Sequence, residues 1–187
     1  SIIGNLTYVR TNVPSINITI NGSDTYNIVK NESLSVIISN KTDRLVELNI
    51  SFNTTKLDLT NITVTQNSNS SVGSLIVRGI PSFAGINKTV YVDNLTDVTG
   101  GCIKDADIIS INQISSNCKG TNETFLKCPG SFKQYGCELN GSRYKITGLA
   151  HTGVTQANDT AAPIITAISN SNSGSTITLS VTTDENA

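Results

Sequence analysis

The sequence predicts an all-β protein built as an antiparallel β-sandwich. Ile, Val and Thr together make up 60 of the 187 residues, and the apolar residues come in short alternating runs. β-branched side chains lose rotamer freedom in a helix and pack well on a pleated sheet. The runs lie about 8–12 residues apart and end at Asn, Gly or Ser, which is typical of a sandwich of short strands.

The first predicted domain, residues 1–97, is a β-sandwich domain with an N-terminal strand. Asn21-Gly22 stands between two alternating runs and predicts a hairpin turn. The polar tract 66–73 predicts a loop. Strands are expected at 6–10, 16–20, 26–29, 34–38, 46–52, 57–64, 75–77 and 90–92.

Residues 98–157 are predicted to be a disulfide-containing β segment: either the second half of the same unit or a small domain packed against it. The run 106–114 fits a short helix or an irregular strand equally well. Strands are expected at 124–128, 134–139 and 144–146, the last two joined by Asn140-Gly141. A polar linker, 156–160, leads into residues 158–187, where strands at 164–168 and 176–181 form a C-terminal pair and a candidate donor strand.

Acceptor motifs for N-glycosylation, Asn-x-Ser/Thr, are the strongest local signal. Random placement of the asparagines gives about 5 such motifs, and the chain has 14. We therefore expect covalent N-linked glycans, which also shield strand edges on a surface where only 14% of residues are charged. The acceptor asparagines are Asn5, Asn17, Asn21, Asn31, Asn40, Asn49, Asn53, Asn61, Asn69, Asn87, Asn94, Asn122, Asn140 and Asn158.

The four cysteines, Cys102, Cys118, Cys128 and Cys137, lie within 36 residues of one another. An even number in a chain rich in glycosylation motifs predicts two disulfides. Three pairings are open; facing strands around a Pro-Gly loop favour Cys128–Cys137, which leaves Cys102–Cys118. A zinc site is the alternative, but the spacings do not match the usual tetrahedral pattern.

Composition and motifs argue against several classes of function. With 13 Lys+Arg against 14 Asp+Glu and no basic run, we expect no nucleic-acid partner. No apolar stretch is long enough to predict a membrane span. The single histidine, His151, has no nucleophile motif beside it, so no catalytic residue, enzyme activity, cofactor or small-molecule substrate is predicted. Four aspartates are candidate calcium ligands, but no loop pattern supports them and no metal is predicted: Asp93, Asp97, Asp105 and Asp107.

The C-terminal segment carries a family resemblance. Asp159-Thr160-Ala161-Ala162-Pro163-Ile164, followed by the alternating run 175–182, resembles the first two strands of immunoglobulin-like repeats in prokaryotic surface proteins. Two strands cannot bury a core alone. Three explanations stay open: a fragment of a longer protein, strands that close the sandwich of the same chain, or strands that add to a neighbouring subunit. The N-terminal strand at 6–10 is an equally eligible donor.

A second resemblance covers residues 88–156. Val90-Tyr91-Val92-Asp93, Cys102-Ile103-Lys104-Asp105-Ala106 and the run 147–154 are similar to a module of surface glycoproteins from uncultured archaea. This resemblance implies an archaeal envelope or extracellular-filament origin, similar in character to thread-like pili and S-layer glycoproteins. It brings no catalytic residues with it.

We predict from these features a secreted, cell-surface structural subunit. Copies of the chain would assemble by β-strand donation into an extracellular homopolymer, because an unpaired strand satisfies its backbone on an open sheet edge. A head-to-tail contact of this kind gives a filament. The alternative prediction is a domain of a non-polymeric surface adhesin or S-layer glycoprotein, displayed rather than polymerised.

Overall fold

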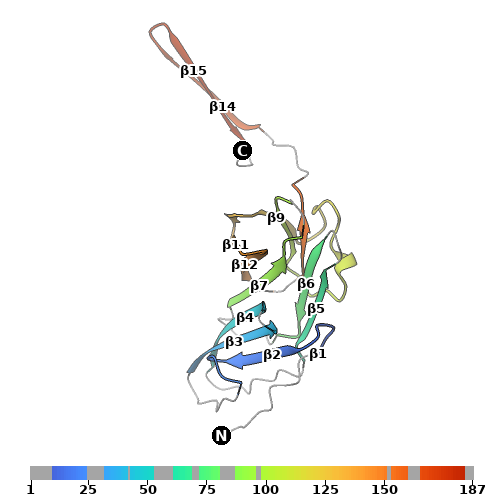
Figure 1. The fold of residues 1–187 in the computed structure, drawn as a ribbon. Helices are drawn as coiled ribbons and strands as arrows, with labels where there is room; N and C mark the ends of the chain where they lie inside the picture. The colour runs from blue at the N-terminus through green and yellow to red at the C-terminus, as the bar shows by residue number, and fades with distance from the viewer. Residues whose placement is uncertain are drawn as a thin grey trace.

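The protein is a sandwich of two packed β-sheets followed by a two-stranded hairpin (Figure 1). The computed structural model describes residues 10–24, 32–41, 43–52, 61–68, 72–80, 87–95, 98–150, 153–159 and 165–183. Within these residues the only helical element is the single 3₁₀ turn η1 (Ile111–Gln113). The predicted all-β class is confirmed.

The first sheet has six strands in the spatial order β1-β5-β6-β13-β8-β9. Neighbours are antiparallel except for the two-residue β1, which runs parallel to β5. The strands are β1 (Arg10–Thr11), β5 (Thr63–Ser68), β6 (Gly73–Arg78), β13 (Gly153–Ala157), β8 (Gly100–Lys104) and β9 (Glu123–Lys127).

The second sheet has seven antiparallel strands in the order β10-β11-β12-β7-β4-β3-β2. The strands are β10 (Gly130–Phe132), β11 (Tyr135–Asn140), β12 (Arg143–Leu149), β7 (Asn87–Asp93), β4 (Asp43–Phe52), β3 (Glu32–Asn40) and β2 (Ile16–Ile20). A third, two-stranded sheet pairs β14 (Ile165–Ser173) with β15 (Thr176–Thr183).

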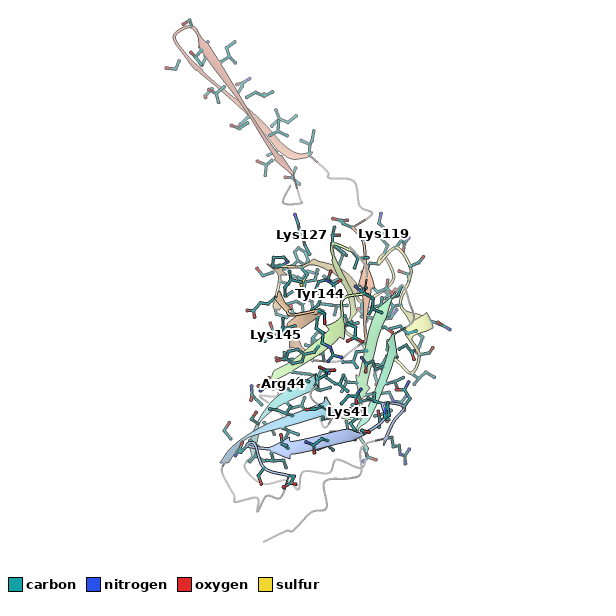
Figure 2. The ribbon with its side chains drawn as sticks, viewed as in Figure 1. Lys41, Arg44, Lys119, Lys127, Tyr144 and Lys145 are labelled. Carbon is teal, nitrogen blue, oxygen red and sulfur yellow. A yellow bond between two sulfur atoms is a disulfide. The ribbon has the colours of Figure 1, made fainter. Side chains whose placement is uncertain are left out.

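The main core lies between the two large sheets and follows the alternation of the sequence. In β4, Val46, Leu48 and Ile50 are at most 1% exposed, while the intervening Asn49 is exposed. Tyr144 of β12 points into the same interior, and its hydroxyl donates a hydrogen bond to the carbonyl oxygen of Val98 at 2.6 Å (Figure 2). The polar end of this buried ring is therefore satisfied within the core.

Residues 98–157 complete both sheets of one sandwich. Their strands β8, β9 and β13 extend the first sheet beyond β6, and β10, β11 and β12 extend the second sheet beyond β7. In the structure, residues 98–157 therefore form the second half of a single unit and not a small separate domain. The two halves of the sequence share one core, because Leu126 and Ile146 join the same buried cluster as Val46.

The prediction of a linker at 156–160 is wrong for its first two residues. Gln156 and Ala157 belong to β13, which pairs with both β6 and β8, and Gln156 is only 5% exposed. The polar side chain is tolerated because its groups are bonded: Oε1 accepts from the backbone N–H groups of Gly73 at 2.7 Å and Leu95 at 3.2 Å. A buried amide whose hydrogen bonds are made carries little penalty.

The segment 105–122 covers the outer face of the first sheet. The sequence pattern at 106–114 fitted a short helix or an irregular strand, and the structure has neither of these over that length, only η1 within a loop. Ile108 and Ile114 pack with Ile76 and Cys102 in a second buried cluster on this face. The spacing of Ile108 and Ile114 therefore results from their packing against the sheet, and not from a helix or strand that contains both residues.

Other expected elements differ in their bounds. Residues 66–68 were expected in a loop but belong to β5, where they pair with Gly73, Ser74 and Leu75 of β6. The Asn21-Gly22 turn is present, closed by a bridge between Ile20 and Ser23. The expected strands at 6–9 and 26–29, and residues 57–60 of the next, lie outside the described residues.

Candidate functional site

The acceptor asparagines lie on the surface wherever the structure describes their side chains. Asn40 and Asn94 are half-buried, and none of the nine described is buried. Asn87 begins β7, and Asn5, Asn31, Asn53 and Asn69 lie outside the described residues. The exposed acceptors are Asn17, Asn21, Asn49, Asn61, Asn122, Asn140 and Asn158.

At three of the described acceptors, Asn21, Asn94 and Asn158, the amide oxygen already accepts a hydrogen bond; that of Asn21 accepts from the backbone N–H of Ser35 at 2.8 Å. Oδ1 of Asn158 accepts from the backbone N–H of Thr99 at 3.2 Å, and Oδ1 of Asn94 accepts from Nε2 of Gln156 at 3.0 Å. An N-linked sugar is attached to the amide nitrogen, which leaves the oxygen able to accept. All three hydrogen bonds are therefore compatible with a modified asparagine.

The cysteines form two disulfides, Cys102–Cys118 and Cys128–Cys137, with Cα–Cα distances of 5.6 and 5.2 Å. This is the pairing that the sequence favours. The first bond ties the segment 105–122 to β8 beneath it. The second joins the start of the β10 hairpin to β11, at the side of the sandwich where the chain crosses from one sheet to the other.

The C-terminal hairpin stands clear of the sandwich, and every residue from 165 to 182 is exposed (Figure 1). In the described part of the chain, β14 and β15 pair only with each other. The explanation in which these strands close the sandwich of their own chain is therefore wrong. An isolated two-stranded hairpin is at best marginally stable in water.

The two faces of this hairpin differ sharply in composition. Residues opposite each other on paired strands lie on the same face. One face carries large apolar side chains that are 51–75% exposed. The cross-strand pairs on this apolar face are Ile168–Val181, Asn170–Leu179 and Asn172–Ile177. The other face, called here the hydroxyl face, consists only of Ala167, Ser169, Ser171, Ser173, Thr176, Thr178, Ser180 and Thr182.

A bulge adds a further residue to the apolar face. Ile165 lies opposite Thr183, whereas Ala167 lies opposite Thr182, so β14 has one extra residue here. A bulge of this kind shifts the alternation of the strand by one position. It places Ile165 on the same face as Ile168, and all five large apolar residues of the hairpin then share one face.

The hairpin also lacks the devices that normally protect exposed strands. Residues 165–183 contain no charged residue, and neither of their asparagines, Asn170 and Asn172, begins an acceptor motif. Exposed edges usually carry charges, proline or a covering segment that discourages pairing with other chains. The hairpin thus has the composition of a surface that becomes covered.

Inside the sandwich, Lys88 is buried, at 1% exposed. Its ammonium group donates to the carbonyl oxygen of Ala150 at 3.1 Å. Burial lowers the pKa of Lys88 to about 8, against the opposing charges of Asp105 and Asp107. Two of the aspartates that were weighed as calcium ligands therefore act on this lysine.

Asp105 has a second partner, the hydroxyl of Tyr135, which donates to its Oδ2 at 2.8 Å. Burial, and then this hydrogen bond, raise the pKa of Tyr135 to about 12. Asp93 is bonded elsewhere, in an ion pair with Arg143 at 2.6 Å. Asp97 and His151 lie outside the described residues.

Metal-ligand geometry is found at one place in the described residues, where Cys102, Cys118 and Glu123 lie close together. Both sulfurs are bonded to each other and cannot act as thiolate ligands. Glu123 is engaged by its own loop: the hydroxyl of Ser115, the backbone N–H of Gly120 and the ammonium of Lys104 all donate to it. The cluster is a structural anchor.

A hollow of about 780 Å³ lies beside η1 on the outer side of the first sheet. Polar residues such as Gln66 and Asn112 line it together with Val72 and Ile111, and no lining residue is ionisable. Its walls offer no acid, base or charged anchor for a substrate.

No known protein family, curated protein or solved structure matches this chain. No helix among the described residues has the length and apolar character needed to cross a membrane. Two disulfides are typical of proteins in oxidising compartments. The function must therefore be argued from the hairpin, the sheet edges and the acceptor asparagines.

Proposed function

We propose that this protein is a structural subunit of an extracellular, N-glycosylated filament, and that its C-terminal hairpin docks on the sandwich of a neighbouring copy. The observation that carries the proposal is the exposed apolar face of the hairpin, formed by Ile165, Ile168, Ile177, Leu179 and Val181. The hairpin serves as the donor, with two strands rather than one.

Burial of the apolar face would supply part of the free energy of docking. Burying a large aliphatic side chain contributes about 1.5–3 kcal/mol, so covering most of these five contributes about 5–10 kcal/mol. Loss of translational and rotational freedom on association costs roughly 4–15 kcal/mol. Main-chain hydrogen bonds along an added strand supply the remainder.

The contact is head-to-tail, because the hairpin and the sandwich of one copy are different surfaces. Such a heterologous contact leaves one donor and one acceptor free at the ends of every oligomer. Unless the rotation between copies closes a ring, the product is a filament. The same feature explains why the hairpin is exposed in a single chain.

Glycans at the exposed acceptor asparagines support this function by protecting the rest of the surface. The sandwich carries few charges, and bulky sugars would keep it hydrated and prevent unspecific strand pairing. The resemblance of the sequence motifs in residues 88–156 to archaeal surface glycoproteins implies the same exterior location and an archaeal origin.

A second function, display within a non-polymeric surface adhesin or S-layer protein, is favoured by one observation. Asp159 and Pro163 precede the hairpin in the pattern of an immunoglobulin-like repeat. In that case the apolar face would be covered by further strands of the same polypeptide, and this chain alone would remain monomeric.

Sedimentation velocity of the full chain, with matched lysine substitutions, tests the proposal. Leu179→Lys places a charge on the apolar face, and Thr178→Lys places the same charge on the hydroxyl face of the same strand. We expect the wild type and Thr178→Lys to form long oligomers that electron microscopy resolves as filaments, and Leu179→Lys to remain monomeric. A wild type that is monomeric at all concentrations would instead favour the display function.

A further inference from the structure

We propose that the acceptor for the hairpin is the side of the sandwich formed by β9, β10 and β11, called here the β10 rim, on a second copy of this chain. This inference rests on the proposed function, and it identifies the surface that receives the hairpin. β9 ends the first sheet and β10 ends the second, so both sheets present their last strand on this rim.

The β10 rim has an open strand edge. β10 opposes only Tyr135, Gly136 and Cys137 of β11. Beyond them, Glu138–Asn140 have no neighbouring strand on that side in the described part of the chain. An added strand would continue the second sheet here through main-chain hydrogen bonds.

The rim also has uncovered apolar side chains on the correct face. Phe132 lies opposite Tyr135, and Leu139 is two residues beyond Cys137, so both share the inner face of the sheet with buried neighbours. Nevertheless Phe132 is 48% exposed and Leu139 is 54% exposed. A donor that adds its apolar face in register with this inner face would cover both residues.

Acceptor motifs are sparse on this rim: Asn140, the last residue of β11, is the one acceptor asparagine within its three strands. No acceptor asparagine lies between Asn122 and Asn140, a stretch that includes all of β9 and β10. Glycans at Asn122 and Asn140 would border the docking surface and leave β10 itself uncovered. The hairpin, the other partner in the contact, is free of acceptor motifs as well.

The opposite rim, at β1 and β2, is closed by two devices. Asn17 and Asn21, on β2 and its following turn, are exposed acceptor asparagines, so sugars would cover that edge. On the other sheet, the side chain of Asn12 forms two hydrogen bonds with the backbone of Gln66, donating at 2.8 Å and accepting at 3.0 Å. These two hydrogen bonds satisfy backbone groups of β5 that a neighbouring strand would otherwise bind.

The distribution of charged residues also favours the β10 rim as the acceptor of the hairpin. Lys119 and Lys127 are exposed beside the β10 rim, and Figure 2 shows both at one end of the sandwich. Asp184 and Glu185 directly follow β15 in the sequence. Opposite charges steer association and fix its orientation.

A glycan introduced on the β10 rim, in a host that glycosylates these motifs, tests whether the rim receives the hairpin. Ser131→Asn with Lys133→Thr creates the motif Asn-Phe-Thr on β10, and the control, Ser131→Gln with Lys133→Thr, changes the same positions without creating a motif. We expect the glycosylated variant to lose assembly, with its sedimentation shifted entirely to the monomer. The control should assemble like the wild type.

Single substitutions on the donor separate failure of this inference from failure of the proposed function. Asn172→Ser makes Asn170 an acceptor on the apolar face, and Asn172→Ala is its control; Ser169→Asn creates an acceptor on the hydroxyl face. We expect only the apolar-face glycan to block assembly. If it does so while the β10 glycan does not, the β10 rim is not the acceptor and the filament function survives. If none of these glycans affects assembly, both proposals are wrong.

Discussion

Ile168 lies directly opposite Val181 across the C-terminal hairpin, and both side chains are more than half exposed. In a folded sheet, such a cross-strand pair stabilises the structure when other apolar groups cover it. Here the covering layer is absent from the chain's own described residues. The pair therefore supports the proposal that the hairpin is one half of an interface.

Glycan occupancy should follow exposure. We expect glycopeptide mass spectrometry of protein from a host that glycosylates these motifs to find Asn49 and Asn61, which are exposed, more fully occupied than the half-buried Asn40. Oδ1 of Asn40 is buried without a hydrogen-bond partner, so the transferase reaches this side chain less readily. An intact mass equal to the 19.8 kDa of the bare chain would contradict the glycosylation prediction.

The buried lysine should make stability rise with pH. The pKa of Lys88 is about 8 in the folded protein and 10.5 in the unfolded chain, so the unfolded state binds the proton more tightly. Stability is therefore lowest below pH 8, and we expect the free energy of unfolding to rise by about 1–2 kcal/mol between pH 8 and 9.5. Urea titrations monitored by circular dichroism measure this rise.

Lys88→Met is the matched variant for this effect, because it keeps the length of the side chain and removes the charge. We expect its unfolding free energy to be flat over the same pH range. The range stops below pH 10, where Tyr135, with a pKa of about 12 when folded, begins to lower stability. An equal rise in the variant and the wild type would assign the effect to another group.

Glu123 should make the protein sensitive to acid. Burial raises the pKa of its carboxyl, but hydrogen bonds from Ser115, Gly120 and Lys104 outweigh burial and lower it to about 2. Its contribution is complete above pH 4.5 and is lost as the pH falls towards 2. We expect Glu123→Gln to cost about 2–3 kcal/mol at pH 7.

The control for Glu123 is Glu138→Gln. Glu138 pairs with Lys145 at 3.1 Å, but its side chain is 70% exposed, and such surface pairs contribute about 0–1 kcal/mol. Equal losses in the two variants would mean that the loop around Glu123 does not depend on its carboxylate.

The bulge in β12 requires glycine at position 148. Gly148 has φ +82°, and a Cβ added there would lie 1.9 Å from the carbonyl oxygen of Gln134. We expect Gly148→Ala to lower the unfolding free energy by at least about 2 kcal/mol. Gly141→Ala, where φ is +59° and the space is open, should cost only about 1 kcal/mol. Equal melting temperatures for the two variants would contradict this account.

The sequence predicts the regular parts of this fold better than its packed loops. The alternation of Val46, Leu48 and Ile50 was sufficient to place β4, since one face of that strand is buried and the other is not. Gln156 was misplaced in a linker because its burial depends on distant partners, Gly73 and Leu95, that no local pattern reveals.

In the candidate site, too, local patterns were predictable and features that depend on distant residues were not. The alternation at 176–181 predicted β15, and the acceptor motifs predicted exposed asparagines. The single apolar face was not predictable, because it depends on the register between β14 and β15 and on the bulge beside Ile165. The open edge of the β10 rim likewise depends on the length of β10 relative to β11.

Amide hydrogen exchange of residues 165–183, followed in the glycosylated full chain from dilute to concentrated solution, tests the role of the hairpin most directly. In dilute solution, we expect the amides of this isolated hairpin to exchange within seconds. In concentrated solution they should become strongly protected as oligomers form, while the sandwich amides stay unchanged apart from those of the β10 rim. Rapid exchange of the hairpin amides at every concentration would contradict the proposal that it joins one subunit to the next.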